Sequence, residues 1–167
     1  MNQKTRKSIT IQHVTIASER AFVDVRKAIE DVVPKLDITL IEALHKGDQK
    51  RAKEHEESGP KLSIFGERNH GALLEIAGRR CNALQYEIGN PLTASKMTRY
   101  QLGAALYAPL RVLLREDDKG NGVFEYDLPS SLFGQFGDDR VTAVGRTLDE
   151  YLDAALSNAA GLMRPAS

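Results

Sequence analysis

The segment from Tyr86 to Ser131 constrains the fold of this chain more than any other part of the sequence. Its second half holds two apolar runs, residues 106–116 and 123–128, separated by Gly120-Asn121-Gly122. Glycine and asparagine readily adopt the left-handed backbone conformations that tight hairpin turns require. The segment therefore predicts an antiparallel hairpin, around which the rest of the fold must be arranged.

Alternation of apolar and polar residues predicts four more strands, in residues 8–16, 62–66, 71–76 and 83–88. The first of these has a break in phase at Gln12-His13, which is consistent with a β-bulge. Apolar spacings of three and four predict helices between Ser18 and Pro34, and in residues 36–47, 92–101 and 138–160. Ser18 is the expected N-cap of the first helix. Residues 48–57 are strongly charged and predict a solvent-facing helix, and residues 129–136 are expected to form a loop.

This order of elements predicts an α+β domain, in which a curved, largely antiparallel sheet packs on a long C-terminal helix. With 167 residues the chain is long enough for one domain with a real core. We expect that single domain in residues 8–160, with flexible ends at 1–7 and 161–167. Such a sheet often leaves a cavity at the open end of its helix.

Composition narrows the classes of function. The chain has 23 Lys plus Arg and 23 Asp plus Glu, and this balance argues against a general nucleic-acid-binding protein. One cysteine, Cys81, allows no disulfide within the chain and favours a reducing compartment. The first eight residues are polar, and no apolar run approaches the length of a membrane span. We therefore expect a soluble cytoplasmic protein with neither nucleic-acid nor membrane partners.

Several short motifs occur in a characteristic order. They are Phe65-Gly66, Gly89-Asn90-Pro91 followed by a helix with Met97, Ala108–Val112 before the Gly-Asn-Gly turn, and Tyr126–Pro129. In this order and spacing, residues 62–156 resemble the domain-of-unknown-function family 302 (DUF302). The resemblance implies a small α+β fold of the helix-grip or TBP-like kind, with a curved sheet gripping a helix. It also implies frequent self-association, here as a homodimer, and no established biochemical activity.

Complete catalytic and cofactor motifs are missing from the sequence. His55 lies among glutamates, but the H-E-x-x-H pattern of zinc proteases is absent, and no G-x-S-x-G elbow or phosphate-binding glycine loop occurs. We therefore expect no metal and no cofactor.

The remaining candidate is a binding cavity with a mixed aromatic and charged wall. Arg111 and Asp127 fall on the two strands of the hairpin, and an ion pair between them is expected. The expected wall consists of Tyr86, Asn90, Met97, Tyr107, Arg111, Tyr126 and Asp127, with His70 at the rim. One interpretation is purely structural, with a salt bridge and aromatic core packing. The other is a pocket in which Arg111 holds an anionic headgroup while Met97 and the tyrosines surround an apolar body.

Three functions remain open. The leading hypothesis is a non-catalytic protein that binds a small molecule or another protein. The second is an enzyme that uses His70, Asp127 and Arg111 as acid, base and anion clamp. The third is a structural or regulatory module that binds a partner protein through the charged residues 48–57.

Overall fold

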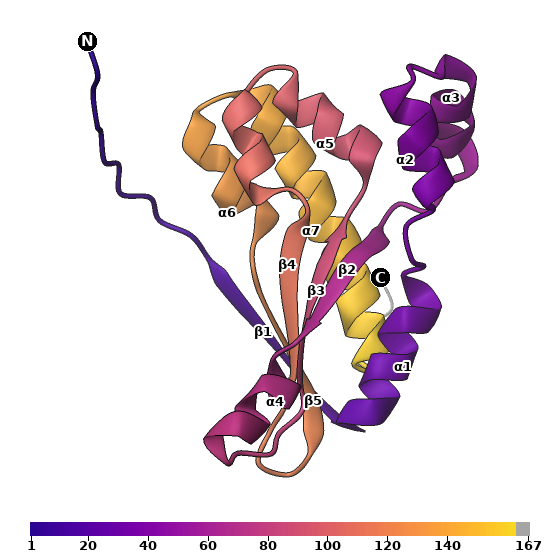
Figure 1. Ribbon diagram of the computed structural model, residues 1–167, viewed down its shortest axis with the longest axis vertical. Helices are drawn as coiled ribbons and strands as arrows, with labels where there is room; N and C mark the ends of the chain where they lie inside the picture. Colours follow the sequence, from indigo (N-terminus) through magenta and orange to yellow (C-terminus); the bar gives the residue numbers. More distant parts are fainter. Residues whose placement is uncertain (163–167) are drawn as a thin grey trace.

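A single antiparallel sheet forms the centre of the computed structural model, which describes residues 1–162 (Figure 1). Its five strands have the order β1-β5-β4-β3-β2, and every neighbouring pair is antiparallel. The strands are β1 (His13–Ala21), β2 (Ser63–Asn69), β3 (Ala83–Gly89), β4 (Leu110–Glu116) and β5 (Asn121–Asp127). The predicted α+β class and the hairpin around Gly120-Asn121-Gly122 are confirmed.

The strand order follows from one long crossover. After β1 the chain passes through three helices to the far edge of the sheet, and β2 to β5 then return as consecutive antiparallel neighbours until β5 lies beside β1. The helices are α1 (Phe22–Val32), α2 (Ile38–His45), α3 (Gln49–Ser58), α4 (His70–Leu74), α5 (Pro91–Thr98), α6 (Pro129–Phe133) and α7 (Asp139–Ala159). Short 3-10 turns lie at residues 75–77, 102–107 and 134–136.

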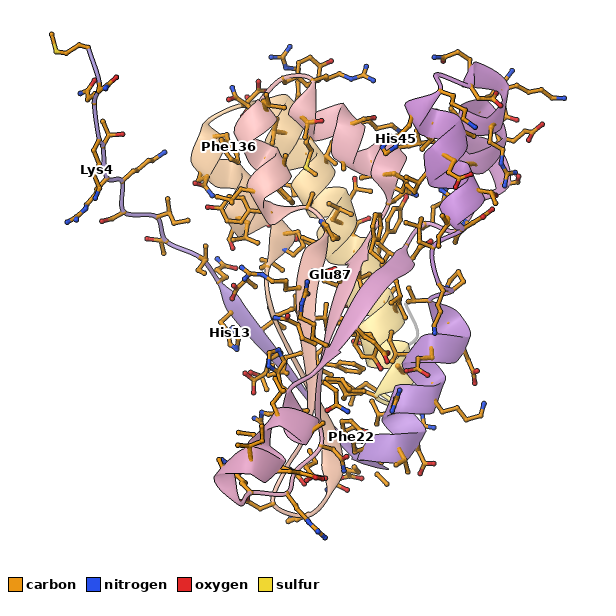
Figure 2. All side chains as sticks on the ribbon, in the orientation of Figure 1. Lys4, His13, Phe22, His45, Glu87 and Phe136 are labelled. Atoms are coloured by element: carbon orange, nitrogen blue, oxygen red, sulfur yellow. The ribbon has the colours of Figure 1, made fainter. Side chains whose placement is uncertain are left out.

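The core lies between one face of the sheet and the long helix α7, which runs behind the sheet in Figure 1. Alternate strand residues such as Tyr86, Val112 and Phe124 are fully buried, as are Leu152 and Leu156 of α7. Burying each such side chain stabilises the fold by roughly 1.5–3 kcal/mol. The opposite face of the sheet carries charged side chains, among them Glu87 and His13, which are visible in Figure 2.

Residues 71–76 were expected to form a strand, and this prediction is wrong. They belong to α4 and the following 3-10 turn. The Oδ1 atom of Asn69 accepts a hydrogen bond from the backbone N–H of Ala72 at 2.9 Å, which caps α4. A side chain at Gly71 would lie 2.2 Å from the carbonyl oxygen of Cys81, so glycine allows this tight approach. Apolar runs this short do not distinguish strand from helix by their period.

The N-cap predicted at Ser18 is also wrong, because β1 continues past it. Ser18 is buried, and its hydroxyl donates a 2.6 Å hydrogen bond to the carbonyl oxygen of Ala160 at the end of α7. Helix α1 begins at Phe22 without a side-chain cap, and the Phe22 N–H donates instead to the carbonyl oxygen of Gly120 at 3.0 Å. A tertiary contact with the β4–β5 turn thus replaces the expected local cap.

Smaller differences concern the loops and ends. β1 begins at His13, and its irregular pairing with β5 lies between Ala17 and Ala21, not at Gln12-His13. Residues 129–136, expected as a loop, form α6 and a 3-10 turn. Residues 1–12 have no regular secondary structure. Most of the end expected to be flexible at residues 161–167 lies outside the described residues.

Candidate functional site

The structure distributes the eight residues of the expected cavity wall over separate places. Tyr86, Met97 and Tyr126 are core residues with exposed fractions of 0%, 1% and 4%. The Tyr86 hydroxyl donates to the Glu30 carboxylate at 2.9 Å, and burial raises the pKa of Tyr86. Burial likewise raises the pKa of Tyr126 to about 12. Tyr107 is half-buried and packs edge-on against aromatic rings at 6.4 Å between centroids. The three tyrosine rings thus pack in the core or against it.

Arg111 and Asp127 lie on the sheet face away from α7, but they do not form the expected ion pair. The Oδ1 atom of Asp127 lies 3.1 Å from Nδ1 of His13, and the His13 Nε2 atom lies 3.3 Å from the Glu125 carboxylate. Glu125 also pairs with Arg115 at 2.6 Å. Hydrogen bonding to Asp127, partly opposed by desolvation, raises the pKa of His13. Among residues 1–162, Arg111 forms no ion pair. The expectation failed because β1 supplies a nearer partner for Asp127.

His70 lies far from this group. It follows the end of β2, and strand pairing places Glu67 in one row with Tyr86, Val112 and Tyr126. His70 is three residues beyond that row in one direction, and Asp127 is one residue beyond it in the other. With strand spacings near 4.8 Å and rises near 3.3 Å, the two residues lie more than about 15 Å apart. The structure therefore does not assemble His70, Asp127 and Arg111 into one site.

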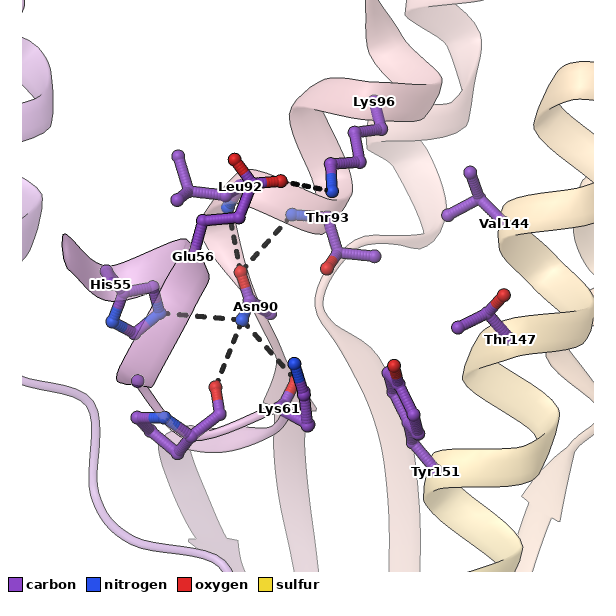
Figure 3. Close-up of a pocket in the computed structure, with 12 residues that line it drawn as sticks. His55, Glu56, Lys61, Asn90, Leu92, Thr93, Lys96, Val144, Thr147 and Tyr151 are labelled. Atoms are coloured by element: carbon purple, nitrogen blue, oxygen red, sulfur yellow. Dashed lines mark hydrogen bonds and ion pairs between the residues drawn. The ribbon is translucent and has the colours of Figure 1, made fainter. Parts of the chain in front are cut away.

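A concave site of about 180 Å³ lies elsewhere, between the end of α3, the turn from β3 into α5, and α7 (Figure 3). Asn90 is the one residue of the expected wall that lines it. The lining residues are His55, Glu56, Gly59, Pro60, Lys61, Asn90, Leu92, Thr93, Lys96, Val144, Thr147 and Tyr151. We call this site the cleft.

Asn90 ties two walls of the cleft together. Its Oδ1 atom accepts hydrogen bonds from the backbone N–H groups of Leu92 at 2.9 Å and Thr93 at 3.2 Å, which caps α5. Its amide Nδ2 donates to the carbonyl oxygens of Pro60 at 3.2 Å and Lys61 at 3.4 Å. Since both ends of the side chain are bound to the protein, Asn90 holds the cleft in shape.

His55 completes this cross-link from α3. Its Nε2 atom lies 3.4 Å from the Asn90 amide nitrogen, and an N–H donor there requires the unprotonated nitrogen of the ring. Desolvation, with a smaller contribution from the positive charge of Arg51, lowers the pKa of His55 and favours that neutral form. A Cβ atom at Gly59 would lie 2.4 Å from the ring, so glycine leaves the space that His55 occupies.

The charged groups of the cleft are mostly positive. Lys96 of α5 pairs with Glu56 of α3 at 2.5 Å, and this contact, together with nearby Arg99 and Lys61, lowers the pKa of Glu56. Lys61 forms no ion pair within the described part of the chain. Tyr151, which faces Asn90 across the cleft in Figure 3, makes no hydrogen bond through its hydroxyl to any described residue. The Lys61 amine is therefore available for a ligand, as are the hydroxyls of Tyr151 and of Thr93, whose side chain likewise makes no hydrogen bond to a described residue.

Eleven of the twelve lining residues, all but Asn90, were not part of the expected wall. His55, Lys61, Lys96 and Tyr151 come from three segments of the chain and meet only in the folded structure. Asn90 was expected on the cavity wall, but its role as the N-cap of α5 was not predicted, although an asparagine directly before the first residue of a helix is a capping signal.

The described residues include no group of three or more His, Cys, Asp or Glu side chains placed to hold a metal ion. None of their helices combines the length and apolar character needed to cross a membrane.

Comparisons with known proteins concern the family and the fold. The sequence matches the family described as "Domain of unknown function DUF302" over residues 49–159. The structure is similar to the crystal structure of the uncharacterized conserved protein DUF302 from Bacillus stearothermophilus, with a TM-score of 0.64 and 13% sequence identity. That similarity covers 88% of this chain and 97% of the other. No curated protein matches the sequence.

Proposed function

Because this chain belongs to the DUF302 family, whose description names no activity, we propose a function from the cleft itself: the protein binds a small organic anion without transforming it. The observation that carries the proposal is the unpaired Lys61 amine on the same cleft as the unpaired Tyr151 hydroxyl. An ammonium and a hydroxyl donor together suit a carboxylate, which accepts hydrogen bonds only.

The rest of the cleft supports this interpretation. Lys96 adds a second amine at the far wall, and its pairing with Glu56 keeps that amine in a defined position. Both ends of the Asn90 side chain and the Nε2 atom of His55 already have partners within the protein, so we assign these two residues to the scaffold. A cleft of about 180 Å³ lies below the roughly 300–1,000 Å³ of sites for drug-sized ligands, which favours a small ligand.

The proposal is tested by titrating the protein with acetate, malonate and citrate, followed by calorimetry and by NMR shifts of the cleft residues. We expect binding of at least one of these carboxylates and a dependence on salt concentration. Lys61→Met should weaken binding by about tenfold to a hundredfold, because a hydrogen bond to a charged group contributes about 1.5–3 kcal/mol.

The matched control is Lys119→Met. Lys119 is exposed at the β4–β5 turn, outside the cleft, and its replacement changes the net charge equally. Binding by the control should equal that of the wild type. The proposal fails if no carboxylate binds, or if the Lys61 and Lys119 variants bind equally well.

Homodimer formation and a cytoplasmic location stay predictions. The same holds for the alternative in which residues 48–57 bind a partner protein.

A further inference from the structure

An apolar groove of about 410 Å³ adjoins the cleft, between the end of α1, the start of β2 and α7. Its apolar walls include Val32, Leu62, Ala154 and Ala155. Val32 is 44% exposed although it is a large apolar side chain on this wall. The groove is therefore a solvent-facing apolar surface next to a polar site.

We propose that the anion of the cleft is the head of a single-chain amphiphile, a straight-chain alkyl carboxylate, whose alkyl chain lies in this groove. This inference depends on the function proposed above and adds the chemical class of the ligand.

The two cavities share a boundary, and that boundary carries the argument. Pro60, Lys61 and Tyr151 line both the cleft and the groove. Lys61 and Tyr151, which carry the unpaired amine and hydroxyl, thus line the place where polar surface passes into apolar surface. A ligand bound there with its carboxylate between these two groups has an apolar wall within reach of its chain.

Charge distribution also favours this occupant. Lys61 is the one charged residue among those that line the groove, and the other polar residues are Tyr151 and Asn158. Negative charge at one end only, followed by an uncharged body, complements this surface. A dicarboxylate or a sugar phosphate would instead place polar groups against Val32 and Leu62 without hydrogen-bonding partners, which is costly.

The test is a calorimetric series of straight-chain carboxylates from butanoate to decanoate, kept below their aggregation limits, with 1-alkanols of equal length as uncharged controls. Each added methylene should tighten binding roughly fourfold until the groove is filled, from the transfer free energy of a buried CH₂. The alkanols should bind at least about tenfold more weakly than the carboxylates, because they lack the charge that Lys61 recognises.

Ala154→Phe is designed to fill the groove and leave the cleft open. Ala154 lies half-buried on α7 and lines the groove but not the cleft. Its control, Ala143→Phe, places the same side chain at an exposed position of α7 outside both cavities. The Ala154 variant should bind butanoate normally and lose the dependence on chain length, whereas the control should keep it. Equal thermal denaturation of the two variants shows that both are folded.

The outcomes separate this inference from the proposed function. Binding of acetate or butanoate with no gain from longer chains overturns the amphiphile and leaves the small-anion site standing. Chain-length dependence that persists in Ala154→Phe, or alkanols that bind as tightly as carboxylates, also overturns it. Failure of every carboxylate overturns both proposals. A dimer that Ala154→Phe dissociates would identify a second copy of the chain as the occupant and would overturn the inference as well.

Discussion

Replacing Asn90 with alanine would remove two sets of hydrogen bonds, one from each end of the side-chain amide. The Oδ1 atom caps α5 through hydrogen bonds to Leu92 and Thr93, and the Nδ2 amide crosses to the loop after α3 and to His55. Because the two ends of the amide bind different elements, the cost of the substitution can be divided into a local part and a tertiary part.

The magnitude follows from these contacts. Loss of an asparagine N-cap costs about 1 kcal/mol. The contacts of the amide nitrogen are long, at 3.2–3.4 Å, so together they contribute about as much as one ordinary hydrogen bond, roughly 1 kcal/mol. Asn90→Ala should therefore lower the free energy of unfolding by about 2 kcal/mol and Tm by about 4–8 °C.

A matched control is available at Asn69, which caps α4 through a single 2.9 Å hydrogen bond to Ala72 and donates no amide hydrogen bond to the other described residues. Asn69→Ala should cost about 1 kcal/mol, the cap alone. Urea unfolding followed by far-UV circular dichroism at pH 7.5 measures both variants. Equal losses in the free energy of unfolding for the two variants would refute the idea that the amide cross-link stabilises the fold.

Asn90→Asp sharpens the test through His55. The aspartate keeps a cap acceptor, but its second oxygen faces the Pro60 and Lys61 carbonyl oxygens and His55 Nε2, where the wild-type amide donates. In the wild type the pKa of His55 is lowered on folding, so its contribution to stability is complete above pH 6.5 and is lost as pH falls below that value. The aspartate should raise the pKa of His55. The free energy of unfolding of the variant, relative to that of the wild type, should therefore increase as pH falls. An unchanged His55 titration in NMR would contradict this reasoning.

Two further predictions concern packing and pH. Gly145→Ala should destabilise the protein by about 1–2 kcal/mol in thermal unfolding, since its Cβ would lie 2.9 Å from the Cα of Ser130 and overpacking outweighs the roughly 1 kcal/mol gain in helix propensity. Gly134→Ala, with nothing within 4 Å of its Cβ, should be neutral or stabilising, and the same sign for both would refute the packing argument. Hydrogen bonding to Asp127 raises the pKa of His13 on folding. The stabilisation of the fold by protonated His13 is therefore complete below pH 6.5 and is lost as pH rises through the folded-state pKa. His13→Gln should therefore cost more stability at pH 6 than at pH 8.5 in urea unfolding, and a cost independent of pH would count against the pair.

Local sequence patterns predicted the elements whose conformation depends on a few neighbouring residues. The β4–β5 hairpin follows from glycines around Asn121, one of which, Gly120, has a φ of 82°. Helix α7 follows from a sustained period near 3.6, and the α+β class follows from the order of the elements. The N-cap at Asn90 is also a property of a few consecutive residues, but the sequence placed Asn90 on the candidate wall without predicting the cap.

Tertiary structure decided everything that depends on which segments meet. The apolar alternation of residues 71–76 fitted a strand, but Asn69 and the tight approach of Gly71 to Cys81 made a helix. The hairpin that carries Arg111 and Asp127 was anticipated, but their side chains lie on the face away from the core, and β1 brings His13 to Asp127 because β1 pairs with β5.

The cleft also shows the difference between local sequence patterns and long-range contacts. Lys61 and Tyr151 are 90 positions apart in the sequence, and neither belongs to a motif. They line one cleft because β2 forms the sheet edge where the end of α3 meets the β3–α5 turn and α7. A local pattern specifies backbone conformation within a few residues, whereas a binding site is a set of distances between side chains, and only long-range packing sets those distances.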